Sequence, residues 1–335
     1  MHKQLLKRCL TYTAIVLLMA MLILSVVLWQ MTGRLLNNRS EVSPTVAAFS
    51  NRVSSSVRIE TLDCAPKTRC LLLTPIKGTV PHKRANLLRR QLPQFNVTPS
   101  AYGDIQGIVV LLHGKKSRKE NSIYTGLRLT AAGLAVIIPD LPGHGENRLP
   151  YAGFGTLDGE ADIAVQALDY SRRYLNQHEQ LPKQLPAALW GYSMGGSYAN
   201  YTLAKYPEYF KAVVIQSSFD CMQTILLDRI DFLPNSLQQP VVAYFRWLVK
   251  IRSGIDVRQM TPIHAARHMT LPVIQFHGKQ DRTIPFTAGK TLYQAYPNTD
   301  KRFISIPDGG HNDSLTKKTP VYAPVIAFIL QHLTE

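Results

Sequence analysis

A serine between two glycines is the residue in this chain best placed for chemistry. The segment GYSMG at 191–195 follows a short apolar run and precedes a stretch of helical character, and Ser193 stands at its centre. The spacing G-x-S-x-G is typical of a serine on a sharp strand-to-helix turn. Such a turn strains the backbone and leaves no room for side chains at 191 and 195, which explains the glycines. N–H groups of the following helix would face negative charge that develops at the serine. We therefore predict that Ser193 is a nucleophile.

A serine hydroxyl needs a base to activate it, and the base needs an acid to orient it. His311 lies in a glycine-bearing loop after one apolar run, and Asp281 follows another. The predicted triad is Ser193, Asp281 and His311, in the order nucleophile, acid, base. Two alternatives remain. His277 could be the base, although its place at a strand end suggests a structural role. Asp308 could be the acid, although it would have to fold back within its own loop.

Alternating apolar runs and helical patterns surround these residues. Continuous apolar runs predict buried strands at 107–112, 134–139, 187–190, 212–217, 273–277 and 302–306. Helical patterns occupy 123–132, 159–175 and 325–333. This alternation predicts an α/β fold with a mostly parallel sheet, in which ligands bind at the carboxyl ends of the strands.

Two further strands, 57–62 and 69–76, are predicted to form an antiparallel hairpin before the α/β pattern begins. Cys64 and Cys70 flank its turn, and we expect a disulfide between them, which requires an oxidising compartment. The alternative is two unpaired thiols. Cys9 and Cys221 need no partner.

Five motifs in order carry a resemblance to a known family. From about residue 57 to the end, the chain resembles α/β-hydrolases of the serine-aminopeptidase-like and monoglyceride-lipase-like kind. The motifs are HG at 113–114, PDLPGHG at 139–145, GYSMGG at 191–196, HGKQD at 277–281 and GGH at 309–311. The resemblance implies that the backbone N–H groups of Met194 and Lys115 form the oxyanion hole. Lys115 departs from the aromatic or aliphatic residue often found there, and His144 is expected to stabilise its turn.

The resemblance also implies a helical cap over the site, here at about 219–262. Helical patterns at 221–233 and 240–251 fit this cap and carry several aromatic residues, Phe232, Tyr244, Phe245 and Trp247. Aromatic residues at helical spacing serve packing more often than substrate binding. An apolar tunnel for an acyl chain, with the substrate delivered from a nearby bilayer, is the sharper hypothesis.

The first 33 residues predict a membrane anchor. Residues 9–33 carry no charge, and as a helix of ~1.5 Å per residue they exceed a hydrocarbon core of ~30 Å. Lys3, Lys7 and Arg8 favour a cytoplasmic N-terminus, and Trp29 suits the far interface. The catalytic domain would then lie outside the cytoplasm, in the periplasm if the protein is bacterial. A cleaved signal peptide is the alternative, but the apolar run is long and no cleavage site of the A-x-A kind follows.

Two polar segments link the anchor to the α/β pattern. Residues 34–56 are rich in serine and predict a stalk, so that 57–335 is the hydrolase domain. Residues 77–103 form a basic insertion, interpreted as a solvated loop or amphipathic helix, with contact to acidic lipid headgroups as the alternative.

Charge and composition limit the classes of function. The 335 residues carry a net charge of +16, yet no nucleic-acid-binding motif is present, so nucleic acid is not expected as a partner. No metal or organic cofactor is required. We expect a membrane-anchored serine hydrolase that cleaves a carboxylic ester, with an acyl substrate and the membrane lipid as partners. Alternatives are a serine peptidase or thioesterase of the same fold, or a catalytically silent membrane-tethered scaffold.

Overall fold

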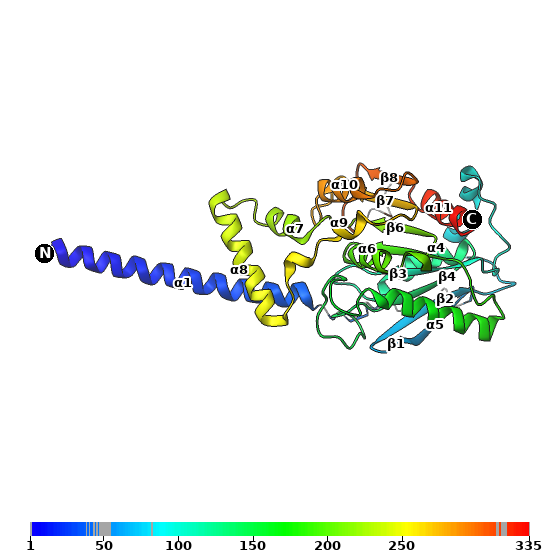
Figure 1. Ribbon diagram of the computed structural model, residues 1–335, viewed down its shortest axis with the longest axis horizontal. Helices are drawn as coiled ribbons and strands as arrows, with labels where there is room; N and C mark the ends of the chain where they lie inside the picture. Colours follow the sequence, from blue (N-terminus) through cyan, green and yellow to red (C-terminus); the bar gives the residue numbers. More distant parts are fainter. Residues whose placement is uncertain are drawn as a thin grey trace.

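One eight-stranded sheet forms the body of the protein, and a single long helix projects from it (Figure 1). The computed structural model describes residues 2–37, 39, 41, 42, 44, 46, 55–81, 83–312, 315 and 320–334. Most of the predicted stalk from residue 38 to 54, and His82 of the basic insertion, lie outside the described residues.

The sheet has the predicted mostly parallel arrangement. Its strands stand in the order β1-β2-β4-β3-β5-β6-β7-β8, and every pairing from β4 onward is parallel, whereas β1–β2 and β2–β4 are antiparallel. The strands are β1 Val57–Ala65, β2 Thr68–Pro75, β3 Gly107–Leu112, β4 Leu134–Pro139, β5 Ala187–Tyr192, β6 Ala212–Gln216, β7 Val273–Gly278 and β8 Lys301–Ile306. The continuous apolar runs of the central strands arise because both faces of the sheet are covered.

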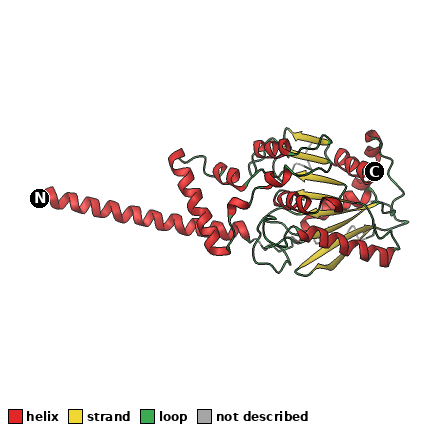
Figure 2. Ribbon diagram, in the orientation of Figure 1, coloured by secondary structure: helices red, strands yellow, loops and turns green. Residues whose placement is uncertain are grey.

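Helices cover both faces, as Figure 2 shows. One face carries α5 Asp162–Glu179, α6 Met194–Lys205, α9 Pro262–Ala266 and α10 Phe286–Ala295, whose apolar residues share one core cluster. The opposite face carries α3 Lys83–Gln91, α4 Ile123–Ala131 and α11 Tyr322–Leu333, which share the other. Neighbouring residues of a strand point to opposite faces, so Val110 belongs to the first cluster and Val109 to the second.

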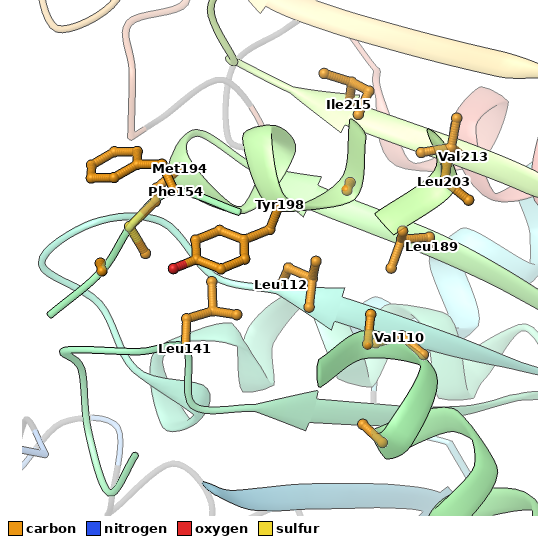
Figure 3. Close-up of a cluster of buried hydrophobic side chains, with 14 of the residues drawn as sticks. Val110, Leu112, Leu141, Phe154, Leu189, Met194, Tyr198, Leu203, Val213 and Ile215 are labelled. Atoms are coloured by element: carbon orange, nitrogen blue, oxygen red, sulfur yellow. The ribbon is translucent and has the colours of Figure 1, made fainter. Parts of the chain in front are cut away.

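The core of the first face reaches the predicted nucleophile. Tyr198 and Met194 of α6 lie near Leu112, Leu141 and Phe154 in Figure 3, and all five side chains are buried. Packing of the first turns of α6 against the sheet therefore fixes where this helix begins.

Helix α1, His2–Leu36, is the projecting helix. Its segment Leu6–Leu36 has a mean hydropathy of 2.5 and is long and apolar enough to cross a membrane. The helix ends on the body: Leu36 is fully buried, and its carbonyl accepts a hydrogen bond of 2.8 Å from the Ala152 N–H. Asn37 contacts the Pro150 carbonyl at 2.8 Å. The first residues of the predicted stalk thus belong to α1 and its contact with the body, since Leu35 and Leu36 have apolar surface to bury.

The hairpin β1–β2 closes the antiparallel end of the sheet. Its turn joins Ala65 to Thr68, and the structure links Cys64 to Cys70 by a disulfide across it. Both cysteines are buried.

The basic insertion forms α3 and the short 3-10 helix Leu92–Phe95. These helices lie at the end of the body remote from α1, beside the C-terminus (Figure 1). Arg89 is held there by hydrogen bonds to the carbonyls of Ala131 and Ser100. This placement favours the surface-helix interpretation over contact with lipid.

The cap insertion between β6 and β7 contains α7 Met222–Asp228, α8 Asn235–Ser253 and a short 3-10 helix, Val257–Gln259. Helix α7 ends five residues before the predicted boundary, and α8 begins at Asn235 instead of residue 240. Pro240 therefore lies inside α8, where it removes one backbone hydrogen bond.

Candidate active site

Ser193 lies between the last residue of β5 and the first residue of α6. Its backbone angles are φ 54° and ψ −115°, a conformation that residues other than glycine rarely adopt. The surroundings maintain this strain, because the Ser193 N–H donates to the Gln216 carbonyl of β6 at 2.8 Å. The Ser193 carbonyl accepts from the Ser218 hydroxyl at 3.0 Å.

The two flanking glycines are required by close backbone approach. A Cβ at Gly191 would lie 2.4 Å from the Gly195 carbonyl oxygen, and a Cβ at Gly195 would lie 2.2 Å from the Leu112 carbonyl oxygen. Each contact is far shorter than a van der Waals distance. Both positions therefore exclude any side chain, as the sequence spacing indicated.

The structure brings the three predicted triad residues together in one hydrogen-bonded chain. His311 Nε2 lies 3.0 Å from Ser193 Oγ, and His311 Nδ1 lies 2.7 Å from Asp281 Oδ2. All three follow the carboxyl ends of parallel strands, β5 for the serine, β7 for the aspartate and β8 for the histidine. The arrangement has the geometry needed for proton transfer from the serine hydroxyl to the imidazole.

Asp281 is held as a buried carboxylate. Its Oδ1 accepts the N–H groups of Thr283 at 2.8 Å and Ile284 at 2.9 Å. Burial opposes ionisation of this carboxyl, but hydrogen bonds with His277 and His311 outweigh that effect and hold the pKa of Asp281 well below its usual range. The group is therefore negative at neutral pH, as an acid that orients an imidazole must be.

The two alternative residues occupy other places. His277 is fully buried and lies 3.0 Å from the Ile284 carbonyl and 3.2 Å from Asp281 Oδ2 through the same Nε2. It supports the turn that carries the acid. Asp308 lies in the loop of His311, but the carboxylate that contacts the imidazole is that of Asp281.

The two predicted oxyanion residues flank Ser193. Met194 is the first residue of α6, so its N–H belongs to the positive end of that helix. On the other side, a Cβ at Gly114 would lie 3.3 Å from Ser193 Cβ. Lys115 follows Gly114 directly in the sequence, so its backbone lies close to Ser193. Burial, together with the charges of Lys116 and Arg229, lowers the pKa of Lys115 to about 8.

A buried ion cluster that the sequence reasoning missed holds the segment after Gly114. Lys119 has no exposed side-chain surface and lies 2.8 Å from Asp140 Oδ2 and 3.0 Å from Glu120. It also pairs with Glu146. Asp140 Oδ1 in turn accepts the Lys119 N–H at 2.8 Å. The cluster ties the predicted oxyanion segment to the turn after β4, and a lysine five residues after HG gave no signal of this role.

The histidines near that turn are structural. His113 Nε2 accepts the Leu141 N–H at 3.0 Å, and burial lowers the pKa of His113. His144 Nδ1 contacts the Pro142 carbonyl at 2.9 Å, and burial lowers the pKa of His144 to about 4. Both imidazoles are therefore neutral at pH 7, and the placement of His144 fits the expected turn-stabilising role.

Tyr192 is a second residue that sequence reasoning missed. Its hydroxyl donates to Asn312 Oδ1 at 2.7 Å and to the His311 carbonyl at 3.2 Å, and its ring centre lies 5.3 Å from that of His311. The residue before the nucleophile thus positions the loop of the predicted base. The position of Tyr192 inside GYSMG was the one sequence signal for this role. The contact with His311 could not be predicted from that motif, because the two residues are 119 positions apart.

The cap reaches the site through α7. Arg229 at the end of α7 donates to the Thr283 carbonyl at 3.2 Å, beside the turn that holds Asp281. At the start of the cap, Phe219 makes an edge-to-face contact with Phe154 at 6.3 Å, and both side chains are buried. The cap therefore covers the edge of the sheet where the triad lies.

A surface hollow of about 650 Å³ lies elsewhere, at the disulfide hairpin. Its lining includes Cys64, Arg69, Arg148 and Arg173 and none of the triad residues. The hollow is therefore separate from the candidate site.

Comparison with known proteins supports the same assignment. A family model described as serine aminopeptidase, S33, matches residues 103–261, which include Ser193 and most of the cap. An esterase of Pyrococcus furiosus, Pf2001, superposes with a TM-score of 0.57 at 14% identity, over 89% of this chain and 98% of the esterase. The chain has the α/β-hydrolase fold.

Two curated proteins are similar to this chain in sequence, but these similarities do not assign a substrate. The chain is 24% identical to a monoacylglycerol lipase of Mycolicibacterium smegmatis, over 69% of this chain and 90% of the lipase. It is 23% identical to the uncharacterized protein YqkD of Bacillus subtilis, over 71% of this chain and 79% of that protein. These similarities relate the chain to an esterase and a lipase and are consistent with its α/β-hydrolase fold.

Proposed function

We propose that this α/β-hydrolase is a membrane-anchored serine hydrolase that cleaves a carboxylic ester. The observation that carries the proposal is the chain of hydrogen bonds from Ser193 Oγ through His311 to Asp281. A serine in a strained turn, an imidazole within reach and a buried carboxylate behind it together make an activated nucleophile.

The proposed reaction proceeds through an acyl-enzyme. As Ser193 Oγ attacks the carbonyl carbon, its proton moves to His311 Nε2, and the Asp281 carboxylate stabilises the resulting imidazolium. The tetrahedral intermediate collapses, the C–O bond to the alcohol breaks, and His311 returns the proton to the departing oxygen. Water then attacks the acyl-enzyme with the same base, which releases the acid and restores the serine.

The N–H groups of Met194 and Lys115 are the proposed donors to the oxyanion. Backbone donors suit this task because they are fixed before the reaction and cannot be removed by a change of side chain. The loss of one such donor typically costs about 3 kcal/mol of transition-state stabilisation. A side-chain substitution at Lys115 would accordingly leave the hydrogen bond to the oxyanion in place.

The ester assignment has support from a structural neighbour described as an esterase and from a sequence relative described as a monoacylglycerol lipase. A serine peptidase is the second candidate, because the matching family model carries the description serine aminopeptidase. A pair of substrates with the same acyl group, one a p-nitrophenyl ester and one a p-nitroanilide, separates the two. The proposal expects turnover of the ester; turnover of the anilide at a comparable kcat/KM would favour the peptidase.

The anchor is part of the proposal. Helix α1 has the length and hydropathy of a membrane span, and the disulfide of Cys64 and Cys70 suits an oxidising compartment. We infer a single span with the N-terminus in the cytoplasm and the hydrolase domain outside it, periplasmic in a bacterium.

The triad is tested by labelling the full chain in detergent with a fluorophosphonate probe. We expect labelling of the parent, no labelling of Ser193→Ala, and labelling at least about 100-fold slower in Asp281→Ala and His311→Ala. Asp308→Ala is the matched control, since that carboxylate lies in the loop of His311 but is not its partner. A folded parent that does not react with the probe would contradict the proposal and favour a silent scaffold.

A further inference from the structure

Helix α8 of the cap has two apolar faces, and one of them is uncovered. The covered face packs into the core through Val242, Phe245 and Val249. The uncovered residues are spaced by seven, three and four positions and so form one stripe along the helix. They are Leu237, Tyr244, Trp247 and Ile251, with exposed fractions of 51%, 37%, 54% and 57%.

An exposed aromatic residue also precedes the helix, and the stripe has an interfacial composition. Phe232, in the connection from α7, is 78% exposed, and the rings of Tyr244 and Trp247 stack at 5.6 Å. Arg246 and Lys250 lie on the adjacent polar side of the helix. Aromatic residues beside basic ones are typical of helices that lie in a membrane interface.

The stripe reaches α1 at its edge, through Tyr244, while its other residues stay exposed. The Tyr244 hydroxyl is 3.0 Å from the Ser25 hydroxyl, and the Arg252 guanidinium lies 4.0 Å above the Trp29 ring. Figure 1 shows α8 crossing α1 near the end of α1 that enters the body, at a steep angle. A helix that crosses a membrane span in this way lies along the membrane surface and not through it.

The position along α1 at which α8 crosses it sets the depth of the stripe in the proposed bilayer. From Arg8 to Trp29 the helix rises about 30 Å, which equals the ~30 Å hydrocarbon core of a bilayer. With Arg8 at one boundary, Trp29 and its partner Arg252 lie at the other. Ser25 and Tyr244 then lie about 6 Å deeper, at one turn of helix. The uncovered stripe is thus at the depth where lipid begins.

We propose that the cap of this hydrolase is docked in the bilayer, with α8 as an in-plane interfacial helix whose apolar stripe contacts lipid. The inference rests on the proposed anchoring by α1 and extends it to the cap. Because the cap covers the triad, substrate would enter from the lipid surface. The site would accordingly favour acyl esters that reside in a membrane over the same esters in water.

A second copy of the chain is the other apolar surface that could cover the stripe. In a two-fold dimer the same patch meets itself, so Arg246 and Lys250 of each copy would approach their own counterparts. Anionic lipid headgroups, in contrast, neutralise these side chains. The observations therefore favour lipid.

Tryptophan fluorescence tests the position of α8 directly, without reference to activity. The chain has three tryptophans, and Trp190 is fully buried in the body. In Trp29→Phe the remaining exposed tryptophan is Trp247, and Trp29→Phe/Trp247→Phe supplies the baseline. The full chain is reconstituted in vesicles of phosphatidylcholine and phosphatidylglycerol, with or without bromine on the acyl chains.

We expect the Trp247 emission to be quenched by brominated acyl chains and protected from iodide in the water. Quenching by iodide without quenching by bromolipid would overturn the proposal. Protection from both quenchers, together with a dimer that Trp247→Glu dissociates, would also overturn it and identify a second copy as the occupant.

Activity tests the consequence for substrate. We expect Ile251→Glu to reduce kcat/KM about tenfold for a long-chain monoacyl ester in vesicles and less than about twofold for a short soluble ester. Gln239→Glu, an exposed substitution on the polar side of the same helix, is the matched control and leaves both values unchanged. Unchanged vesicle activity in Ile251→Glu would contradict lipid docking. A parent inactive on every ester with Trp247 still quenched by bromolipid would refute the proposed function and leave the docking intact.

Discussion

At the scale of single residues, the candidate site depends on contacts that hold the base as much as on the triad. Tyr192 stands beside the nucleophile in sequence, yet its hydroxyl binds the loop of His311. One residue thereby links the strand that carries the serine to the loop that carries the base.

Tyr192→Phe should reduce the rate of fluorophosphonate labelling about fivefold, equivalent to about 1 kcal/mol, because it removes these hydrogen bonds and retains the ring. The free energy of unfolding should change by no more than the same amount. Tyr206→Phe, which loses a hydroxyl contact to Asp162 away from the site, is the control. Equal labelling rates in Tyr192→Phe and the parent would show that the loop needs no such support.

The buried His144 should make stability depend on pH. Its pKa is lowered from about 6.5 to about 4 in the folded chain, so between these values the unfolded chain binds a proton that the folded chain does not. Stability therefore falls as pH decreases through this window. The expected contribution between pH 7 and pH 5 is about 2 kcal/mol.

Denaturant unfolding of the full chain in detergent at pH 7 and pH 5 measures this contribution. His144→Gln should lose less stability than the parent on going to pH 5, whereas His178→Gln, on the exposed side of α5, should behave as the parent does. The same loss in His144→Gln and the parent would assign the acid sensitivity to other groups.

At the scale of elements, the turns after parallel strands do most of the positioning. Lys119 joins the turn after β4 to the segment after β3. Burial disfavours the charge on Lys119, but the carboxylates of Asp140 and Glu146 outweigh that effect and raise its pKa. A buried charge of this kind is stable only while its partners are present.

Lys119→Met should therefore lower the free energy of unfolding by about 3 kcal/mol or more, because it leaves Asp140 buried without its cation. It should also slow fluorophosphonate labelling, since the segment that carries Lys115 loses its attachment. Lys183→Met, at an exposed position, is the control. A thermal melt with no change in Tm would mean that water replaces the ammonium.

At the scale of the whole molecule, the anchor, the cap and the triad lie at one edge of the sheet. Helix α1 ends on the loop after β4, where Leu36 contacts Ala152, and the triad follows β5, β7 and β8 at the same carboxyl edge. The short connection brings this edge toward the proposed membrane, and the basic insertion faces the other way.

The proposed topology predicts the outcome of protease treatment of intact bacterial spheroplasts that express the chain. Protease added outside should degrade the hydrolase domain, and alkylation with and without reductant should show Cys64 and Cys70 joined. A protected domain with both thiols free would place it in the cytoplasm and overturn the topology.

The sequence alone determined the fold class and the identities of the residues that meet at the candidate site. Buried parallel strands require continuous apolar runs, and a strained turn requires Gly191 and Gly195, so both features are visible locally. The order of the motifs then indicated Asp281 and His311, and the structure places His311 in contact with both Asp281 and Ser193.

Only the tertiary structure decided the partners that come from distant segments. The contacts of Tyr192 with Asn312, of Lys119 with Asp140 and of α8 with α1 join residues far apart in the chain. Helical spacing identified the aromatic residues of α8 but not which of its faces is covered, because a local pattern cannot show what packs against it. The tertiary structure shows which face of α8 packs into the core and which face stays exposed beside α1.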